Sequence, residues 1–183
     1  MYEYLEYGQE HIWLFTHNER LWDQCLDFPQ VCWNSTFLSR FCKLFPIQSM
    51  KVVRLRLKLA EELLGEDGSG PRILLLVRDP RGVLQSRRHR AWCPGKPDCD
   101  RPELLCADMV SDYVAAVRMA AIHPTRFRVL RYEDLSLDPF KTVSSLLQFL
   151  GVDFHGKVWD FLDTHTKLDL GGVSSTFRNS KST

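Results

Sequence analysis

The apolar positions of this chain fall into short runs typical of strands and spaced sets typical of helices. The segment 72–77 reads RILLLV, and a continuous apolar run of this length between turn residues predicts a strand buried on both faces. The segment 127–132 (FRVLRY) predicts a second strand. The segment 50–55 (MKVVRL) predicts a third, short strand that leads into a helix ending at Gly65.

Helices are predicted between and after these strands. Asp79 can cap a helix that has Pro80 at its first position and continues to Arg90. Amphipathic spacing and helix-start signals predict two further helices, over about 103–122 and over 139–151. Strand, helix, strand and helix in this order predict an α/β fold, a parallel sheet flanked by helices with right-handed crossovers.

The first fifty residues carry apolar side chains at helical spacing, namely Phe37, Phe41, Leu44 and Phe45. This spacing predicts helices that cover a core. The chain has 183 residues, of which 44% are hydrophobic, and no linker, repeat or low-complexity run divides it. We therefore expect one domain over 1–183.

The charge balance limits the possible partners. The 24 Lys and Arg residues nearly cancel the 23 Asp and Glu residues, so no overall field attracts nucleic acid, and the short basic run at 87–90 adds little affinity. Any anion site must be a local cluster. The apolar runs fall far short of the roughly 20 residues that span a bilayer, so no membrane span is expected in this chain. The acidic segment 1–6 does not resemble a signal peptide.

Six cysteines form two groups, one near the start of the chain and one around a Pro/Gly-rich stretch. The even count is compatible with disulfides, and buried free thiols are the main alternative. The spacing does not match the CxxC or CxxH pattern of a zinc site, so no metal site is predicted. An N-glycosylation sequon at 34–36 and the cysteines together favour an oxidising compartment. The groups are Cys25, Cys32 and Cys42, and Cys93, Cys99 and Cys106.

The segment 78–86 has the features of a phosphate site. Ligands of open α/β sheets lie at the carboxyl ends of strands, where helix N-termini present backbone N–H groups. Arg78 directly follows the strand predicted at 72–77, and Ser86 lies about two helical turns further on. The alternative is that Arg78 pairs with Asp79 or another acid, and that the basic residues of 87–90 form a solvated face.

Three motifs, in this order, resemble those of the Golgi carbohydrate sulfotransferases. The segment 74–87 (LLLVRDPRGVLQSR) is similar to the family's 3′-phosphate-binding motif. The segment 129–135 (VLRYEDL), followed by the helix at 139–151, resembles the family in order and spacing. The segment 176–180 (TFRNS) is similar to a late Arg-Asn-Ser segment. The chain is identified as an invertebrate-type member, with the resemblance strongest over 51–180.

The resemblance implies a fold like that of nucleotide kinases and 3′-phosphoadenosine 5′-phosphosulfate (PAPS) as the donor, with no metal. It implies sulfuryl transfer to the 6-hydroxyl of N-acetylglucosamine or galactose in a glycan, carried by a glycoprotein or proteoglycan in the Golgi. Arg78 and Ser86 would bind the 3′-phosphate, whereas Glu133 and Asp134 are expected to be structural. The candidate donor-binding residues are Arg78, Asp79, Pro80, Arg81, Gly82, Ser86, Arg178 and Ser180.

The chain departs from the family ahead of residue 51. Family members hold the 5′-phosphosulfate in a Gly- and Ser/Thr-rich loop, but here Gly8 is the only glycine before Gly65. They also carry an N-terminal signal-anchor and continue past the position of Thr183. We therefore expect a partial sulfotransferase domain, from a partial gene model rather than a splice form or a degenerate member. The alternative function is a non-catalytic nucleotide- or glycan-binding module derived from such an enzyme.

The acceptor side is less defined by the sequence. In the segment 92–100 a sugar could stack on Trp92 and be oriented by Asp100, and a disulfide-pinned surface loop is an equal alternative. None of the histidines has a partner visible in the sequence, so no catalytic base is assigned.

Overall fold

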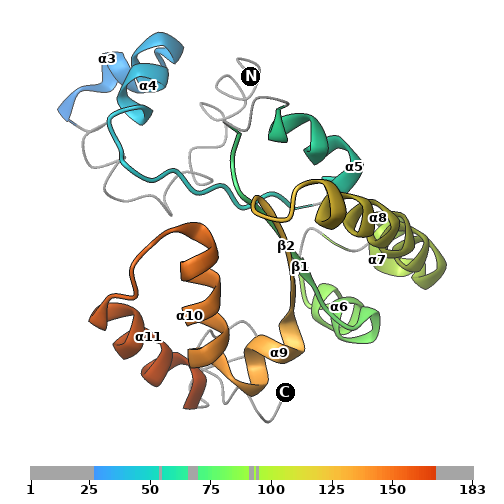
Figure 1. Ribbon diagram of the computed structural model, residues 1–183. Coiled ribbons are helices and arrows are strands. Elements are labelled where there is room, and N and C mark those ends of the chain that lie inside the picture. The colour runs from blue at the N-terminus through green and yellow to red at the C-terminus, as the bar shows by residue number, and fades with distance from the viewer. Residues whose placement is uncertain (1–26, 54, 66–69, 91–92, 94, 168–183) are drawn as a thin grey trace. The chain divides into compact units, whose positions relative to one another are not determined.

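A computed structural model of the protein describes residues 27–53, 55–65, 70–90, 93 and 95–167 (Figure 1). The chain forms two compact units, Met1–Val53 and Arg54–Thr183, and each is described by itself. Among the described helices, none has the length and apolar character needed to cross a membrane.

The first unit contains the helices α3 (Pro29–Cys32) and α4 (Ser35–Cys42). The side chain of Asn34 caps α4 by accepting a hydrogen bond of 3.0 Å from the backbone N–H of Phe37. The ring centroids of Phe37 and Phe41 lie 5.7 Å apart, and those of Phe41 and Phe45 lie 5.2 Å apart. The helical prediction is confirmed here. The described rings pack against one another, and α4 buries no residue; that they cover a core stays a prediction.

The second unit contains most of the described structure. Its elements in chain order are α5 (Leu57–Ala60), the 3₁₀ helix η2 (Glu61–Leu64), β1 (Ile73–Val77), α6 (Pro80–Arg87), α7 (Pro97–Asp100), α8 (Pro102–Ile122), β2 (Phe127–Arg131), α9 (Tyr132–Leu137), α10 (Pro139–Leu150) and α11 (Gly156–Lys167).

The two strands lie side by side and run parallel (Figure 1). In their register Ile73 pairs with Phe127 and Val77 pairs with Arg131. The chain between them passes through α6, α7 and α8, as a parallel connection requires. The predicted α/β architecture with a parallel sheet flanked by helices is therefore confirmed.

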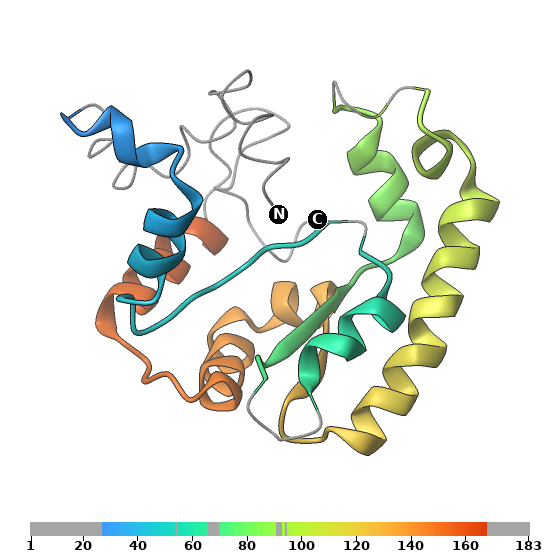
Figure 2. The same cartoon turned by 90° about the horizontal axis from the view of Figure 1, so that it is seen from above.

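Helices cover both faces of this sheet (Figure 2). On one face Ile73 and Leu75 pack against a core contributed by α5, η2, α8 and the start of β2. On the other face the guanidinium of Arg128 donates to the carbonyl oxygen (2.9 Å) and the hydroxyl (2.8 Å) of Ser145 in α10. The buried members of the core are Leu57, Ala60, Leu64, Ala115, Ala116, Met119 and Phe127.

Two strand predictions need correction. The described residues of 50–55 form no strand, because among the described residues no backbone pairs with them, and Met50 is 82% exposed. The prediction that β1 is buried on both faces is also wrong, since Leu76 is 55% exposed. The other residues of β1 are half-buried.

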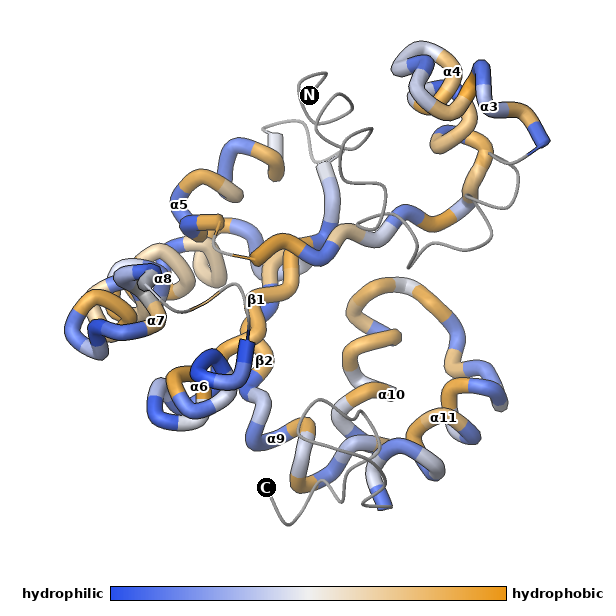
Figure 3. The backbone as a smooth tube through the Cα atoms, turned by 180° about the vertical axis from the view of Figure 1, so that it is seen from behind, coloured by the Kyte–Doolittle hydropathy of each residue, from blue (hydrophilic) through white to orange (hydrophobic). Residues whose placement is uncertain are grey.

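The predicted helices are confirmed, with small shifts at their ends. The helix α6 begins at the predicted cap Asp79 but ends at Arg87 rather than Arg90. The helix α10 ends before Gly151, which has a φ of 69° in the left-handed region that glycine adopts most easily. Figure 3 shows the hydrophobic strand β1 leading into the more hydrophilic α6.

Candidate functional site

The carboxyl ends of both strands lie at one edge of the sheet. Because Val77 pairs with Arg131, the next residues of the two chains, Arg78 and Tyr132, leave the sheet side by side. The helix α6 starts directly after Arg78, and α9 starts at Tyr132. This is the edge at which α/β proteins bind their ligands.

The guanidinium of Arg78 lies between these two helices. Its Cζ atom is 4.3 Å from the centroid of the Tyr132 ring. On the side of α6, a Cβ atom added to Gly82 would stand 3.0 Å from the Nε atom of Arg78, so the helix backbone approaches the guanidinium closely. Among the described residues, Arg78 has no ion-pair partner. The alternative that Arg78 pairs with Asp79 or another acid is therefore wrong for this part of the chain.

Asp79 pairs with Arg81 and caps α6. Its carboxylate accepts a hydrogen bond of 2.8 Å from the backbone N–H of Arg81, and the Arg81 guanidinium also donates to it. Pro80 occupies the first helical position, where no backbone donor is needed. The hydrogen bonds from the Arg81 side chain lower the pKa of Asp79 from 3.8 to about 2. This pair fixes the start of the helix that borders the site.

We expect the contribution of Asp79 to stability to disappear on acidification. Its pKa is lower in the folded chain than its ordinary value of 3.8, so its charged form stabilises the fold above that value, and this contribution is lost as the pH falls through about 2. The free energy of unfolding of wild type and Asp79→Asn, measured in urea across the acid range, should differ most near neutral pH and converge in acid. A difference that does not change with pH would contradict this assignment.

Glu133 joins the two helices at this edge. Its Oε1 atom accepts a hydrogen bond of 2.8 Å from the backbone N–H of Asp79, and this bond is the main reason that the pKa of Glu133 is lowered. Arg131 lies 3.5 Å from the carboxylate of Asp134 and 4.0 Å from that of Glu133. These contacts are of the kind that structural acids make, and the structural role of both acids stays a prediction.

Ser86 lies on the same side of α6 as Arg78. The guanidinium of Arg78 touches the helix at Gly82, and Ser86 is four residues further on, about one turn or 6 Å along the same face. Among the described residues, the Ser86 hydroxyl has no hydrogen-bonding partner, and the side chain is half-buried. The spacing of Gly82 and Ser86 along α6 therefore puts the Arg78 guanidinium and the Ser86 side chain along one face of the helix.

Three of the candidate residues from the sequence cannot be placed in the structure. Arg178 and Ser180 lie outside the described residues, and so does Trp92. The described part of the chain contains no cluster of three or more His, Cys, Asp or Glu side chains that could hold a metal ion.

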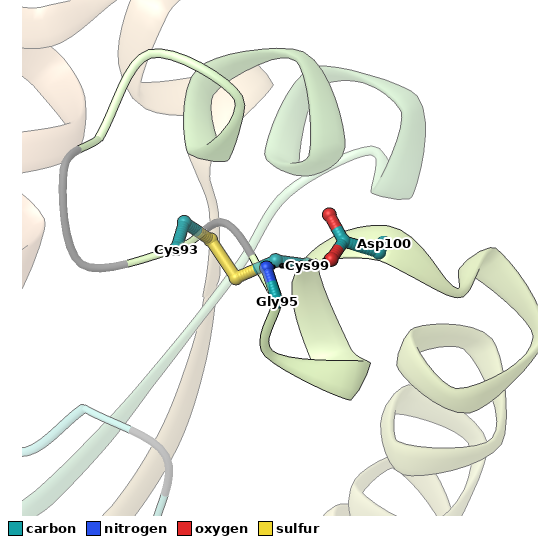
Figure 4. The surroundings of a disulfide bond; sticks show 4 residues. All are labelled: Cys93, Gly95, Cys99 and Asp100. Carbon is teal, nitrogen blue, oxygen red and sulfur yellow. Dashed lines mark hydrogen bonds between the residues drawn. A yellow bond between two sulfur atoms is a disulfide. The ribbon is translucent and has the colours of Figure 1, made fainter.

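A disulfide closes the loop after α6 (Figure 4). Cys93 and Cys99 are joined, with Cα atoms 5.7 Å apart, and the backbone N–H of Gly95 donates a hydrogen bond of 2.8 Å to the carboxylate of Asp100. Cys32 is also disulfide-bonded, whereas Cys42 and Cys106 are exposed free thiols. The disulfide prediction is confirmed for Cys93 and Cys99.

Tyr132 is the member of this edge that the sequence analysis missed as a neighbour of Arg78. Part of the signal was present, because Arg78 directly follows one predicted strand, Tyr132 is the last residue of the other, and parallel strands end at the same edge. Using it required the register of β1 against β2, which the apolar patterns alone do not fix.

Comparison with known proteins identifies the family. The model of the family described as "Sulfotransferase domain" matches residues 68–171, more than half of the chain. Carbohydrate sulfotransferase 1 of Mus musculus is 30% identical over 129 residues, which are 61% of this chain and 31% of the relative. Carbohydrate sulfotransferase 3 of Homo sapiens is 26% identical over 166 residues, 80% of this chain and 35% of the relative. No solved structure matches.

The chain spans about a third of the length of these curated relatives. The matched segment contains both strands and the whole edge around Arg78, Gly82, Ser86 and Tyr132. The nucleotide-kinase-like fold expected from the resemblance agrees with the parallel sheet between helices. On this match the chain is a member of the sulfotransferase domain family, and the relatives named above are carbohydrate sulfotransferases.

Proposed function

We propose that this protein binds PAPS at the edge around Arg78 and transfers its sulfuryl group to the 6-hydroxyl of N-acetylglucosamine or galactose in a glycan. The observation that carries the proposal is the Arg78 guanidinium, which has no ion-pair partner among the described residues and shares one helix face with the Ser86 hydroxyl. A strand-end cation without an internal counter-ion is suited to an anionic ligand.

In this proposal the two side chains receive the 3′-phosphate of the donor. Arg78 supplies charge-assisted N–H donors, and Ser86 supplies a hydroxyl from the same side of α6. Asp79, Pro80 and Arg81 set the start of the helix, and Gly82 leaves room for the guanidinium. PAPS supplies the activated sulfuryl group, and the residues named here hold and orient it.

Two further donor contacts are proposed from the family resemblance alone. Arg178 and Ser180 belong to a segment similar to the family's late Arg-Asn-Ser motif, and we propose that they reach the phosphates of PAPS. They lie outside the described residues, so their assignment depends on mutagenesis: replacing either should weaken nucleotide binding, as replacing Arg78 should.

We propose a Golgi location for this reaction. The Cys93–Cys99 disulfide supports an oxidising compartment, and the sequon at 34–36 is compatible with one. The names of the relatives support a glycan acceptor.

A non-catalytic nucleotide- or glycan-binding module is the second candidate. It is favoured by the sequence ahead of residue 51, which contains no glycine-rich loop and in which Gly8 is the one glycine. Such a loop holds the 5′-phosphosulfate in family members, and this end of the donor carries the reacting group. A module of this kind would bind the nucleotide without transferring sulfate.

Calorimetric titration of the whole chain tests the donor site. Adenosine 3′,5′-bisphosphate should bind at least tenfold more tightly than adenosine 5′-monophosphate, which lacks the 3′-phosphate; this is about 1.4 kcal/mol. Equal binding of the two nucleotides, or none by a folded protein, would refute the donor site. Incubation with radiolabelled PAPS and oligosaccharides ending in N-acetylglucosamine or galactose then separates the candidates, because only the enzyme labels the sugar.

A further inference from the structure

We propose that Asn34, at the start of α4, is the attachment site of an N-linked oligosaccharide. The segment 34–36 (NST) has the Asn-X-Thr pattern that this modification requires. The chain has two other asparagines, Asn18 and Asn179, and neither is followed two positions later by Ser or Thr. Asn34 is therefore the one acceptor that the sequence of this chain offers, and it belongs to a different part of the chain from the residues of the donor site.

Hydrogen bonds already occupy every polar group of Asn34 except its side-chain nitrogen. The backbone N–H donates to the carbonyl oxygen of Val31 at 3.1 Å, and the backbone carbonyl oxygen accepts from the N–H of Leu38 at 2.9 Å. The Oδ1 atom accepts from the backbone N–H of Phe37 at 3.0 Å and so caps α4. Among the described residues, the Nδ2 atom of Asn34 has no partner.

The cap determines which side-chain atom stays available. A backbone N–H must meet an acceptor, so the amide oxygen is the capping atom and the amide nitrogen is left over. Asn34 is exposed, and its backbone is extended, with a φ of −86° and a ψ of 107°, because the residue precedes the first turn of the helix. An external enzyme can therefore reach Nδ2.

The hydroxyl of the sequon is accessible as well. Thr36 is the second residue of α4 and is exposed. A threonine in the middle of a helix can bond to the carbonyl oxygen of the preceding turn, but the first turn has no preceding helical turn. Among the described residues, the Thr36 hydroxyl forms no hydrogen bond.

The cysteine next to the sequon supports the same compartment. Cys32 is disulfide-bonded and only 3% exposed, and the chain reaches the exposed Asn34 two residues later. Disulfides form in secretory compartments, and asparagine glycosylation is a modification of surface loops in secreted proteins. Two independent features of one short segment therefore indicate the compartment in which Asn34 would be modified.

The reaction uses Nδ2 and leaves the cap intact. The donor is an oligosaccharide joined to a lipid through pyrophosphate, and a transferase of the secretory pathway catalyses the step. Nδ2 forms a bond to the anomeric carbon of the first sugar and loses one proton, while the bond from that carbon to the pyrophosphate breaks and the lipid pyrophosphate leaves. The amide oxygen remains an acceptor, so the hydrogen bond from the N–H of Phe37 persists in the glycosylated chain.

Glycosidase treatment of four proteins tests the site. The whole chain is directed into the secretory pathway of cultured mammalian cells as wild type, Asn34→Asp, Thr36→Ala and Thr36→Ser. Wild type and Thr36→Ser, which keeps the sequon, should each migrate faster on a denaturing gel after treatment with peptide N-glycosidase. Asn34→Asp and Thr36→Ala should migrate the same with and without the enzyme.

The two variants without a sequon separate glycosylation from capping. Aspartate caps a helix about as well as asparagine does, so Asn34→Asp keeps the acceptor oxygen and removes the nitrogen. Thr36→Ala keeps Asn34 itself, and Thr36→Ser controls for the change at position 36. A glycan that persists in Asn34→Asp or Thr36→Ala, or a wild-type chain that enters the pathway and stays unmodified, would overturn the proposal.

Mass spectrometry identifies the modified residue directly. Peptide N-glycosidase hydrolyses the glycosylated amide to a carboxylate, which takes up heavy oxygen when the digestion is carried out in labelled water. We expect the label at position 34 of the wild-type peptide, and an asparagine amide unchanged there overturns the assignment. Titration of the same proteins with adenosine 3′,5′-bisphosphate keeps this result apart from the donor site: failure of folded wild type to bind the nucleotide refutes the proposed function and leaves the glycan at Asn34 in place.

Discussion

Replacing Arg78 with alanine is expected to weaken binding of adenosine 3′,5′-bisphosphate by about 1.5 to 3 kcal/mol, or roughly 10- to 150-fold. This is the size of a hydrogen bond to a charged group, and the guanidinium lies against the Tyr132 ring and the backbone at Gly82, at the carboxyl edge of the sheet. The variant should fold normally, because within the described structure Arg78 contributes no ion pair and loses only its contact with a ring. Calorimetry on purified wild type and variant measures both affinities.

The chain offers a matched control on the same strand. Arg72 precedes β1 at the opposite end from Arg78, and its guanidinium donates to the backbone oxygen of Leu150 at 2.9 Å. Arg72→Ala removes the same charge from the protein but leaves the carboxyl edge unchanged, so nucleotide affinity should stay within about twofold of wild type. A similar loss in both variants would point to general electrostatic attraction, and full affinity in Arg78→Ala would remove Arg78 from the site.

The parts of the fold that the sequence predicts best are those determined locally. The strand β1 is bounded by turn residues, and α6 carries its start signals, Asp79 and Pro80, in adjacent positions. The same holds for α10, which begins at Pro139 and ends before Gly151. Caps of this kind act within one turn of the backbone, so a single sequence contains the information that they need.

The parts of the fold that the sequence predicts poorly depend on partners from distant parts of the chain. The segment 50–55 has the composition of a strand, but a strand forms only where a neighbour satisfies its backbone groups. Similarly, the apolar run of β1 does not show how many helices cover each face, and Leu76 is exposed although the pattern predicts its burial. The short helix α9 was missed because residues 132–137 carry strand-end and turn chemistry rather than helical spacing.

The residues of the candidate site also fall into a group that is close in sequence and a group that comes from a distant part of the chain. Arg78 and Ser86 could be identified because they belong to one strand–helix segment, with a spacing set by helix geometry. The partners of that segment are not local: Tyr132 and Glu133 approach it from 54 residues further along the chain. Their roles follow from the parallel register, which becomes visible only when the second strand is placed against the first.

Removing the Cys93–Cys99 disulfide should have the largest expected effect on stability. The bond closes a short loop, with its cysteines six positions apart, and the loop-entropy relation gives about 2 kcal/mol for a loop of this size. For a chain of this length that corresponds to a fall in Tm of about 4 to 8 °C. Both sulfurs belong to buried residues, so the variant Cys93→Ala/Cys99→Ala avoids placing a new polar group inside.

Substitution isolates this bond better than a reducing agent does, because Cys32 is disulfide-bonded as well and would be reduced together with it. The control is Cys106→Ala, which removes an exposed free thiol from α8 and should leave the free energy of unfolding within about 0.5 kcal/mol of wild type. Urea unfolding of the three proteins measures the difference. Nucleotide affinity should remain unchanged in all three, because the loop follows the end of α6 and the phosphate donors precede it. A double variant as stable as wild type would show that the loop is held by its other contacts, among them the hydrogen bond from Gly95 to Asp100.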